Sequence, residues 1–286
     1  MKMNNKPVFK LNIKSVVMIV IISLIVIYSV GLFAYIFLSS FKPLKEVMAR
    51  AKLFPQQATL DNFISLFKAT SSNKNFPRYL LNSMFISACT AVLTSTVSSL
   101  AAYGFSRHNY FGKKIMLNSM LFLYVFPTII LLVPVYKMYS TIGFIDNYLS
   151  LIITYAGLTT PFCTWILVSF FERVPRSLEE AAFVDGATPI KAFIKILLPI
   201  AVPGLVMVLA YSFITAWGEY MFASILIQRN INRTITQSLV DFTADQYINW
   251  GLLLAGSVIV LVPVVSMFIP VSKNFIKGFT AGAVKE

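Results

Sequence analysis

Six long stretches without a charged residue are the feature that most constrains this chain. Each is about 20 residues or longer, and a helix of about 20 residues spans a bilayer core about 30 Å thick. The six stretches are Val16–Leu38, Asn82–Phe105, Ile115–Tyr136, Asn147–Phe171, Ile196–Trp217 and Asn249–Ser272. They predict an all-α integral membrane protein with six transmembrane helices, forming one transmembrane domain over residues 1–286.

The composition excludes a soluble enzyme or a disordered chain. The residues are 57% hydrophobic and only 12% charged, whereas soluble domains carry about 25% charged residues. The net charge of +13 would suggest nucleic acid in a soluble protein. Here it fits basic cytoplasmic loops beside anionic lipid headgroups, so we expect no nucleic-acid partner. Cys89 and Cys163 lie in apolar stretches and are expected to be small buried hydrophobic residues.

The distribution of basic residues predicts the orientation. With the N-terminus inside, the inner segments hold 14 Lys and Arg residues and the outer segments hold 10. Without the long first outer loop, Phe41–Leu80, the outer number falls to 3. We therefore expect both termini in the cytoplasm, with the first apolar stretch as an uncleaved anchor. A surface helix is expected in the first outer loop, over Leu60–Phe67.

The sequence offers little chemistry of its own. His108 is its one histidine, so a Ser–His or Cys–His catalytic pair inside the membrane is not expected. It has no P-loop motif for ATP phosphates and no cluster of metal ligands. Glu219 is the acid at the edge of an apolar stretch, whereas an ion-coupled carrier or channel needs several intramembrane charges. The chain is therefore predicted to be a non-catalytic transport subunit powered by another protein.

The loop that follows the fourth stretch, about residues 174–195, carries the most specific pattern. Ser177 and Glu180 have the spacing of a capping box, which predicts a short helix from Leu178. Gly186 supplies the positive φ that ends such a helix. Thr188 is then expected to cap a second helix that has Pro189 at its first position.

The first of these short helices has a compact apolar side. Ala181, Ala182, Phe183 and Val184 form it. Apolar side chains on a cytoplasmic corner favour docking into a groove of a partner protein. The alternative is an amphipathic connector that lies on the membrane surface.

This loop resembles the EAA loop of ABC-importer permeases. The matching residues are Glu180-Ala181-Ala182, then Gly186 after three intervening residues, and Ile196-x-Leu198-Pro199 after nine more. Outside the loop, further matches are Leu81-Asn82-Ser83, Phe171–Pro175, Asn249-Trp250-Gly251 and Gly278–Lys285. The carbohydrate subfamily, represented by the smaller permease of maltose-type transporters, is the most similar. Gly218 departs from the pattern, because the family commonly has Asn after the Trp.

The resemblance implies the transmembrane subunit of a type I importer in a bacterial cytoplasmic membrane. Its implied partners are a second permease in a heterodimer, two ATPase subunits and an extracellular solute-binding protein. ATP and Mg²⁺ would bind to the ATPase, and this chain would bind no cofactor. The coupling residues would be those of the loop pattern, with Glu180 either capping its helix or pairing with a basic ATPase residue.

The remaining candidates concern the solute, which the resemblance implies to be a sugar or oligosaccharide; a non-sugar solute is the alternative. Trp217, Glu219, Tyr220 and Asn82 are candidates for the substrate path, although aromatic residues at span ends also form the ordinary interfacial belt. In the family, the outer loop corresponding to Phe222–Tyr247 reaches the binding protein. The candidate contacts in that loop are Gln228, Arg229, Asn230 and Asn232, and a solvated connector is the alternative.

Overall fold

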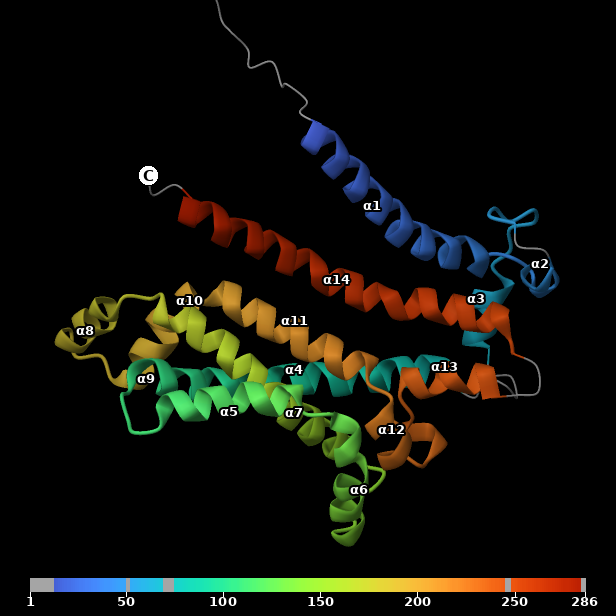
Figure 1. The fold of residues 1–286 in the computed structure, drawn as a ribbon. Helices are drawn as coiled ribbons and strands as arrows, with labels where there is room; N and C mark the ends of the chain where they lie inside the picture. The colour runs from blue at the N-terminus through green and yellow to red at the C-terminus, as the bar shows by residue number, and fades with distance from the viewer. Residues whose placement is uncertain (1–12, 50–51, 69–74, 245–247, 284–286) are drawn as a thin grey trace, which may run out of the picture.

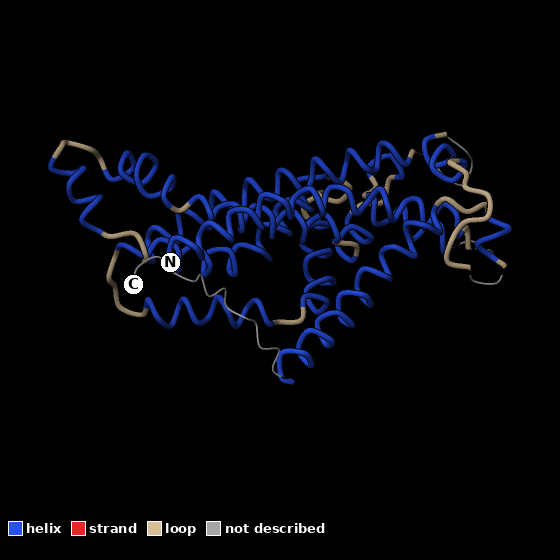
Figure 2. The backbone as a smooth tube through the Cα atoms, turned by 90° about the horizontal axis from the view of Figure 1, so that it is seen from above, coloured by secondary structure: helices blue, strands red, loops and turns tan. Residues whose placement is uncertain are grey.

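All regular structure in the computed structural model is helical across the residues it describes, which are 13–49, 52–68, 75–244 and 248–283 (Figures 1 and 2). The long helices are α1 (Ile13–Ser40), α4 (Phe76–Arg107), α5 (Lys113–Val125), α7 (Tyr148–Glu172), α11 (Val202–Gly218) and α14 (Trp250–Ala283). The shorter ones are α2 (Leu44–Met48), α3 (Asp61–Phe67), η1 (Thr128–Leu131), α6 (Leu132–Thr141), α8 (Arg176–Val184), α9 (Pro189–Ala192), η2 (Phe193–Leu197), α10 (Leu198–Ile200), α12 (Met221–Leu226), η3 (Asn230–Asn232) and α13 (Ile235–Ala244).

The number of membrane spans depends on two bent helix pairs. Four helices among the described residues are long and apolar enough to cross a membrane, and the number becomes six if each bent pair is one span. The prediction of an all-α membrane protein is confirmed. The six expected stretches correspond to these six spans, but two of them are not single straight helices.

Helices α4, α7 and α11 form the centre of the bundle, with α5 packed against α7 and α14 against α11. The face of α4 that is buried in the bundle is rich in small hydroxyl residues at intervals of three and four. Ser87, Thr90, Thr94 and Ser98 are fully buried, and the hydroxyls of Thr94 and Thr159 lie 2.9 Å apart. Small side chains of this kind let membrane helices approach closely, which explains the tight α4–α7 contact.

Prolines break the third and fifth expected spans. Phe126 is extended because the following Pro127 disfavours helical backbone before it, and α5 meets the segment Thr128–Thr141 at 87°. In the fifth stretch, Pro199 has no N–H to continue the helical hydrogen bonding. The chain forms the π-helical turn η2 just before Pro199 and then bends by 81° into α11. The straight part of the fifth span therefore begins at Val202 and not at Ile196.

Helix α1 is the least covered span. None of its most apolar 18-residue window is buried in the chain, and it contacts α14 while leaning away from the central helices (Figure 1). A continuous apolar surface of this length fits a lipid environment. The first apolar stretch is thus one long helix, and its role as an uncleaved anchor stays a prediction; residues 1–12 before it lie outside the described residues.

The two ends of the bundle differ in what they carry (Figure 1). Helices α8 and α9 lie at one end, where α14 also finishes, while α2, α3 and α13 lie at the other. The expected helix in the first outer loop is present as α3, but it is packed into the protein. Its Leu66 is fully buried, and the Asn62 amide donates to the carbonyls of Ser40 and Lys42 at 2.9 and 2.8 Å.

Candidate functional site

The glycine corner between α8 and α9 has the geometry that the sequence predicts. Gly186 has a φ of +81°, and its N–H donates to the Phe183 carbonyl at 3.0 Å. Thr188 then caps α9, because its hydroxyl accepts from the Lys191 N–H at 3.4 Å, and Pro189 is the first helical residue. Two short helices joined at a sharp turn are therefore confirmed for this loop.

The predicted capping box at the start of α8 is wrong. Ser177 cannot be the cap, because the helix already begins one residue earlier, at Arg176. The N-cap residue is Pro175, which makes no side-chain hydrogen bond. Ser177 and Glu180 are both exposed. The chain reaches α8 through Pro175, whose fixed φ suits a helix start without a cap. Glu180 thus has no capping role here and points its carboxylate outward.

The neighbouring acid, Glu179, is the buried one. Its Oε1 accepts from Arg107 Nε at 2.6 Å, with the side chains 4% and 8% exposed. Arg107 also donates to the Val174 carbonyl at 3.2 Å, and Arg176 donates to the Ser106 carbonyl at 3.0 Å. Sequence reasoning missed this pair because Arg107 lies at the end of α4, 72 residues from Glu179.

The outer edge of the corner is apolar and uncovered. Val184 is 88% exposed and Ile190 is 71% exposed, with Leu178 and Phe183 also exposed. An exposed cluster of large apolar side chains at a bundle end is typical of a surface for a partner protein. Ala181 is exposed and Ala182 half-buried, so the EAA residues lie on this same helix.

The last part of the loop pattern connects the corner to α11. Ile196 and Leu198 are half-buried and Pro199 is exposed, while Leu197 between them is fully buried. Leu197 packs with Phe171 and Val208 in one apolar core. The π-helical turn before Pro199 and the bend at Ala201 therefore fix how α8 and α9 sit on the central helices.

At the opposite end of α11, Glu219 is held entirely by the protein. Its carboxylate accepts from the Tyr155 hydroxyl at 2.6 Å and from the N–H groups of Phe222 and Ala223 at 2.8 and 3.2 Å. The two backbone donors belong to the first turn of α12, where a carboxylate is stabilising. Glu219 lies just beyond the end of α11, as the sequence predicts, and its place on the outer side stays a prediction. It joins α7, α11 and α12.

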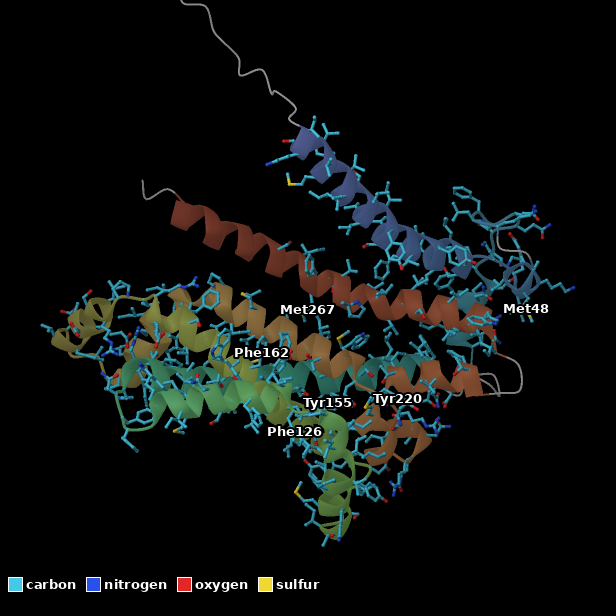
Figure 3. All side chains as sticks on the ribbon, in the orientation of Figure 1. Met48, Phe126, Tyr155, Phe162, Tyr220 and Met267 are labelled. Carbon is cyan, nitrogen blue, oxygen red and sulfur yellow. The ribbon has the colours of Figure 1, made fainter. Side chains whose placement is uncertain are left out.

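Trp217 and Tyr220 face different surroundings. Trp217 is buried, stacks on Phe213 with ring centroids 5.8 Å apart, and donates from Nε1 to the Val260 carbonyl at 3.1 Å. That packing leaves no indole face for a solute. Tyr220 is exposed near the outer end of the bundle (Figure 3), and of these two aromatic candidates it alone offers a ring to solvent.

Asn82 is buried and supports the outer loop. Its amide nitrogen donates to the carbonyls of Ile231 and Arg233 at 3.0 and 2.9 Å. Arg78, one turn earlier in α4, donates to the same Ile231 carbonyl at 3.1 Å. The Tyr79 hydroxyl donates to Asn230. Asn82 is therefore a contact between α4 and the loop, and its amide does not face an open path.

The candidate binding-protein contacts lie in a loop that Asp146 holds in one shape. Asp146, before α7, accepts from the N–H groups of Gln228 and Arg229 at 3.2 and 3.0 Å and pairs with the Arg229 side chain at 3.1 Å. Asn232 donates to Asp146 Oδ2 at 3.2 Å. Gln228, Arg229 and Asn230 remain exposed. The expected loop 222–247 is thus mostly packed helices and this short exposed tip, with residues 245–247 outside the described residues.

An aromatic cluster in the middle of the bundle was not predicted. Phe162 stacks on Tyr124 with centroids 4.5 Å apart, and Tyr211 lies 4.9 Å from the same ring. Trp165, one turn further along α7, is at 6.4 Å. Phe162 is 14 residues into α7, about 21 Å along the helix and so near its middle (Figure 3). Tyr124 and Trp165 are exposed in the isolated chain.

The sequence contains these aromatic residues, but nothing in it indicates that they meet. Four aromatic residues came from three separate apolar stretches, and only the fold brings them together. In the described part of the chain, no group of three His, Cys, Asp or Glu residues could hold a metal ion. The candidate site residues therefore fall into three groups: the α8–α9 corner at one end of the bundle, the aromatic cluster near the middle of α7, and the loop held by Asp146.

Comparison with protein families gives one model that covers most of the bundle. Residues 94–271 match the family described as "Binding-protein-dependent transport system inner membrane component". The matched range begins within α4 and ends within α14, so it contains the corner, the aromatic cluster and the outer loop.

Individual relatives are similar over nearly their whole length. The chain is 34% identical to the inner membrane ABC transporter permease protein YcjP of Escherichia coli over 92% of this chain and 94% of that protein. It is 35% identical to the trehalose/maltose transport system permease protein MalG of Thermococcus litoralis, over 82% and 84%. It is 31% identical to the trehalose transport system permease protein SugB of Mycobacterium tuberculosis, over 92% and 95%.

A solved structure has the same arrangement of helices. It is a bacterial ABC transporter involved in import of the acidic polysaccharide alginate. One of its chains superposes with a TM-score of 0.78, at 19% identity, over 94% of this chain and 99% of that one. At this identity the likeness concerns the fold.

Proposed function

The chain belongs to the family of binding-protein-dependent transport system inner membrane components, and from this premise we propose that it imports sugars or oligosaccharides. It is a multi-pass permease with the type I importer fold. Relatives at 31–35% identity are named for trehalose, maltose and maltodextrin transport, which supports a sugar as the solute here.

The uncovered apolar edge of α8 is the observation that carries the proposal. Leu178, Phe183 and Val184 are exposed at a bundle end, while Glu179 on the other side of the helix is buried against Arg107. A helix with one anchored side and one free apolar side suits insertion into a groove of another protein. We assign that groove to an ATPase subunit, which would bind ATP and Mg²⁺ and close on them to move the bundle.

The remaining partners follow from this assignment. With α8 in the cytoplasm, the loop tip Gln228–Asn232 lies on the outer side, where a solute-binding protein would deliver its ligand. A second permease would face this chain across the membrane, and two ATPase subunits would lie below the pair. The C-terminal end of α14 lies at the α8 end of the bundle, which supports cytoplasmic termini.

The aromatic cluster is our candidate for solute contact at the membrane centre. Exposed aromatic faces stack on the apolar faces of sugar rings, and the hydroxyls of Tyr124 and Tyr211 offer hydrogen bonds. Tyr220 would be an earlier contact on the outer side. The anchored Glu219 would then shape the entrance through α12 without touching the solute, and Trp217 would support the helices around it.

Uptake into proteoliposomes tests the proposal. The chain is purified with its second permease and ATPase subunits, and radiolabelled di- and oligosaccharides are offered together with the matching binding protein. We expect uptake that needs ATP and the binding protein and that ionophores do not abolish. Uptake driven by an ion gradient without ATP would overturn the assignment, and uptake of amino acids but not of sugars would overturn the solute class.

A phenylalanine-to-alanine substitution in the cluster tests the solute contact. Phe162→Ala removes the ring on which Tyr124 stacks and against which the tilted Tyr211 ring packs. Stacking contacts contribute on the order of 1–3 kcal/mol, so the substitution should raise the concentration for half-maximal uptake about tenfold or more. The matched control is Phe122→Ala, an exposed aromatic residue of α5, which should leave that concentration unchanged.

A further inference from the structure

Helix α4 is the one long, well-packed span that runs without a proline in its interior. Its 32 residues extend from Phe76 to Arg107, and its sole proline, Pro77, is in the first turn. By contrast, α7 contains Pro161, and the third and fifth spans are bent by 87° and 81°. At 1.5 Å per residue α4 is about 48 Å long. It is therefore stiffer than its neighbours and reaches from one end of the bundle to the other.

The cytoplasmic end of α4 is locked to α8. Arg107 is the last residue of α4, and its side chain makes the buried ion pair with Glu179 and a second bond to the Val174 carbonyl. Arg176 closes the contact from the other side through the Ser106 carbonyl. Because two charged partners are nearly excluded from water, their separation would leave an unpaired buried charge. The start of α8 therefore has to follow the end of α4.

The outer end of α4 is locked to the loop tip in the same way. Asn82 donates to the two carbonyls that flank Asn232, and the Ser83 hydroxyl accepts from the Ile235 N–H at 2.8 Å. Ser83 and Asn82 are both buried. Arg78 adds a third donor to the loop backbone. Between Asn82 and Arg107 the helix rises about 37 Å.

We propose that α4 is a rigid link between the ATPase-facing helix α8 and the outer loop tip, with Arg107–Glu179 and Asn82 as its two end clamps. The inference rests on the proposed function, because it takes α8 as the part that meets the ATPase. Motion of α8 would displace the loop tip through α4, and binding at the loop tip would bias α8 by the same coupling free energy. Arg107, Glu179 and Asn82 are thus positioning residues that never touch the solute.

The test breaks each clamp separately and measures coupling. Arg107→Gln and Asn82→Ala are prepared in the assembled complex, and the ratio of solute imported to ATP hydrolysed is measured with and without binding protein. Allosteric couplings commonly amount to about 5–150-fold, so we expect each variant to lower this ratio about tenfold. ATP hydrolysis should persist and lose its dependence on the binding protein, which a general loss of stability would not produce.

Control variants distinguish a loss of coupling through α4 from a general loss of folding. Lys113→Gln removes the more exposed ion pair between Lys113 and Glu172, 3.8 Å apart, near the same end of the bundle, and should leave the ratio unchanged. Arg107→Gln combined with Glu179→Gln should be no worse than Arg107→Gln alone, because one pair is lost in both. Exchanging the two residues should recover part of the ratio.

Two results would overturn the link. One is that either clamp variant keeps the wild-type ratio of solute imported to ATP hydrolysed. The other is a loss of uptake and ATP hydrolysis in proportion to the loss of intact complex. In that case the variant with Arg107 and Glu179 exchanged would also show no recovery of the ratio. Failure of the proposed function itself would be recognised differently, because the wild-type complex would then show no ATP-dependent uptake at all.

Discussion

The two exposed connections at the ends of the bundle differ in the side chains they expose and in the bonds that hold them. The α8–α9 corner exposes apolar side chains such as Val184 and is fixed to the bundle through a buried ion pair. The loop tip Gln228–Asn232 exposes mostly polar side chains; its backbone accepts hydrogen bonds from α4 and donates hydrogen bonds to Asp146. The first surface, being apolar, favours a contact that persists throughout the lifetime of a complex. The second can stay in water and meet a partner transiently.

Gly186→Val should have the largest effect, because it breaks the shape of the cytoplasmic corner. At a φ of +81° a β-branched residue costs on the order of 1–3 kcal/mol, and a Cβ there meets no other atom within 4 Å. The strain is therefore purely in the backbone. We expect uptake to be lost while membrane insertion survives, measured by transport and by yield of the chain.

Gly186→Asn is the matched control for that prediction. Asparagine tolerates left-handed backbone far better than valine, so it should retain most of the uptake. If valine and asparagine transport equally well, the turn geometry is not what the corner contributes.

The next effect is expected at Glu219, which anchors the outer end of α11 and α12. Glu219→Leu would leave the Tyr155 hydroxyl and two backbone N–H groups without their acceptor. Each such loss costs about 1–3 kcal/mol, so thermal stability and complex yield should both fall clearly. Glu219→Gln keeps one acceptor oxygen and should fall less in stability. Equal melting temperatures for the wild type and both variants would show that Glu219 does not stabilise the junction of α11 and α12.

A smaller effect is expected at Asp146, which shapes the loop tip. Asp146→Ala removes the acceptor of the Gln228 and Arg229 N–H groups, and water can replace it only in part because the Asp146 side chain is 12% exposed. The free energy of unfolding should therefore fall, but by less than in Glu219→Leu, because the bonds from Asn82 still hold the loop backbone. Stimulation of ATP hydrolysis by the binding protein should fall several-fold, because the loop tip is no longer presented in one conformation.

Asp146→Asn provides the comparison at the same position. Its backbone φ is +62°, which asparagine adopts readily, and its amide oxygen can still accept. Stimulation should be close to that of the wild type. A wild-type response from the alanine variant as well would mean that the loop tip needs no such support.

Arg229→Gln should have the smallest effect on the folded protein. Its ion pair with Asp146 leaves the Arg229 side chain 80% exposed, and exposed pairs contribute at most about 1 kcal/mol. Melting temperature should stay within about 2 °C of the wild type. A lower affinity of the complex for the binding protein, measured by titrating hydrolysis, would identify Arg229 as a direct contact.

Sequence reasoning succeeded where the cause is local. The apolar stretches located the spans, and Gly186 and Thr188 gave the turn and the second cap because each acts within a few residues. It failed at Ser177, whose capping pattern is local but was overridden by Pro175 at the helix start. It located one span across Pro127 and one across Pro199, and the structure bends these spans by 87° and 81°.

The contacts between distant segments were beyond reach from the sequence. Nothing near Glu179 distinguishes it from Glu180, and only the end of α4 decides which acid is buried. Asn82 and Trp217 look like pathway residues by their place at span ends. Their partners, the Ile231 and Val260 carbonyls, are 149 and 43 residues away. The aromatic cluster likewise depends on how α5, α7 and α11 pack together.

The most direct test of the account is whether the ATPase subunits remain with the chain when the edge of α8 becomes charged. Val184→Asp alters a side chain that is 88% exposed, so the chain should still fold and insert. Ile231→Asp, at an exposed apolar residue of the outer loop tip, is the control. We predict that affinity purification recovers the ATPase with the control and loses it with Val184→Asp. Equal recovery with both, together with normal ATP-driven uptake by Val184→Asp, would contradict the assignment of α8 as the ATPase contact.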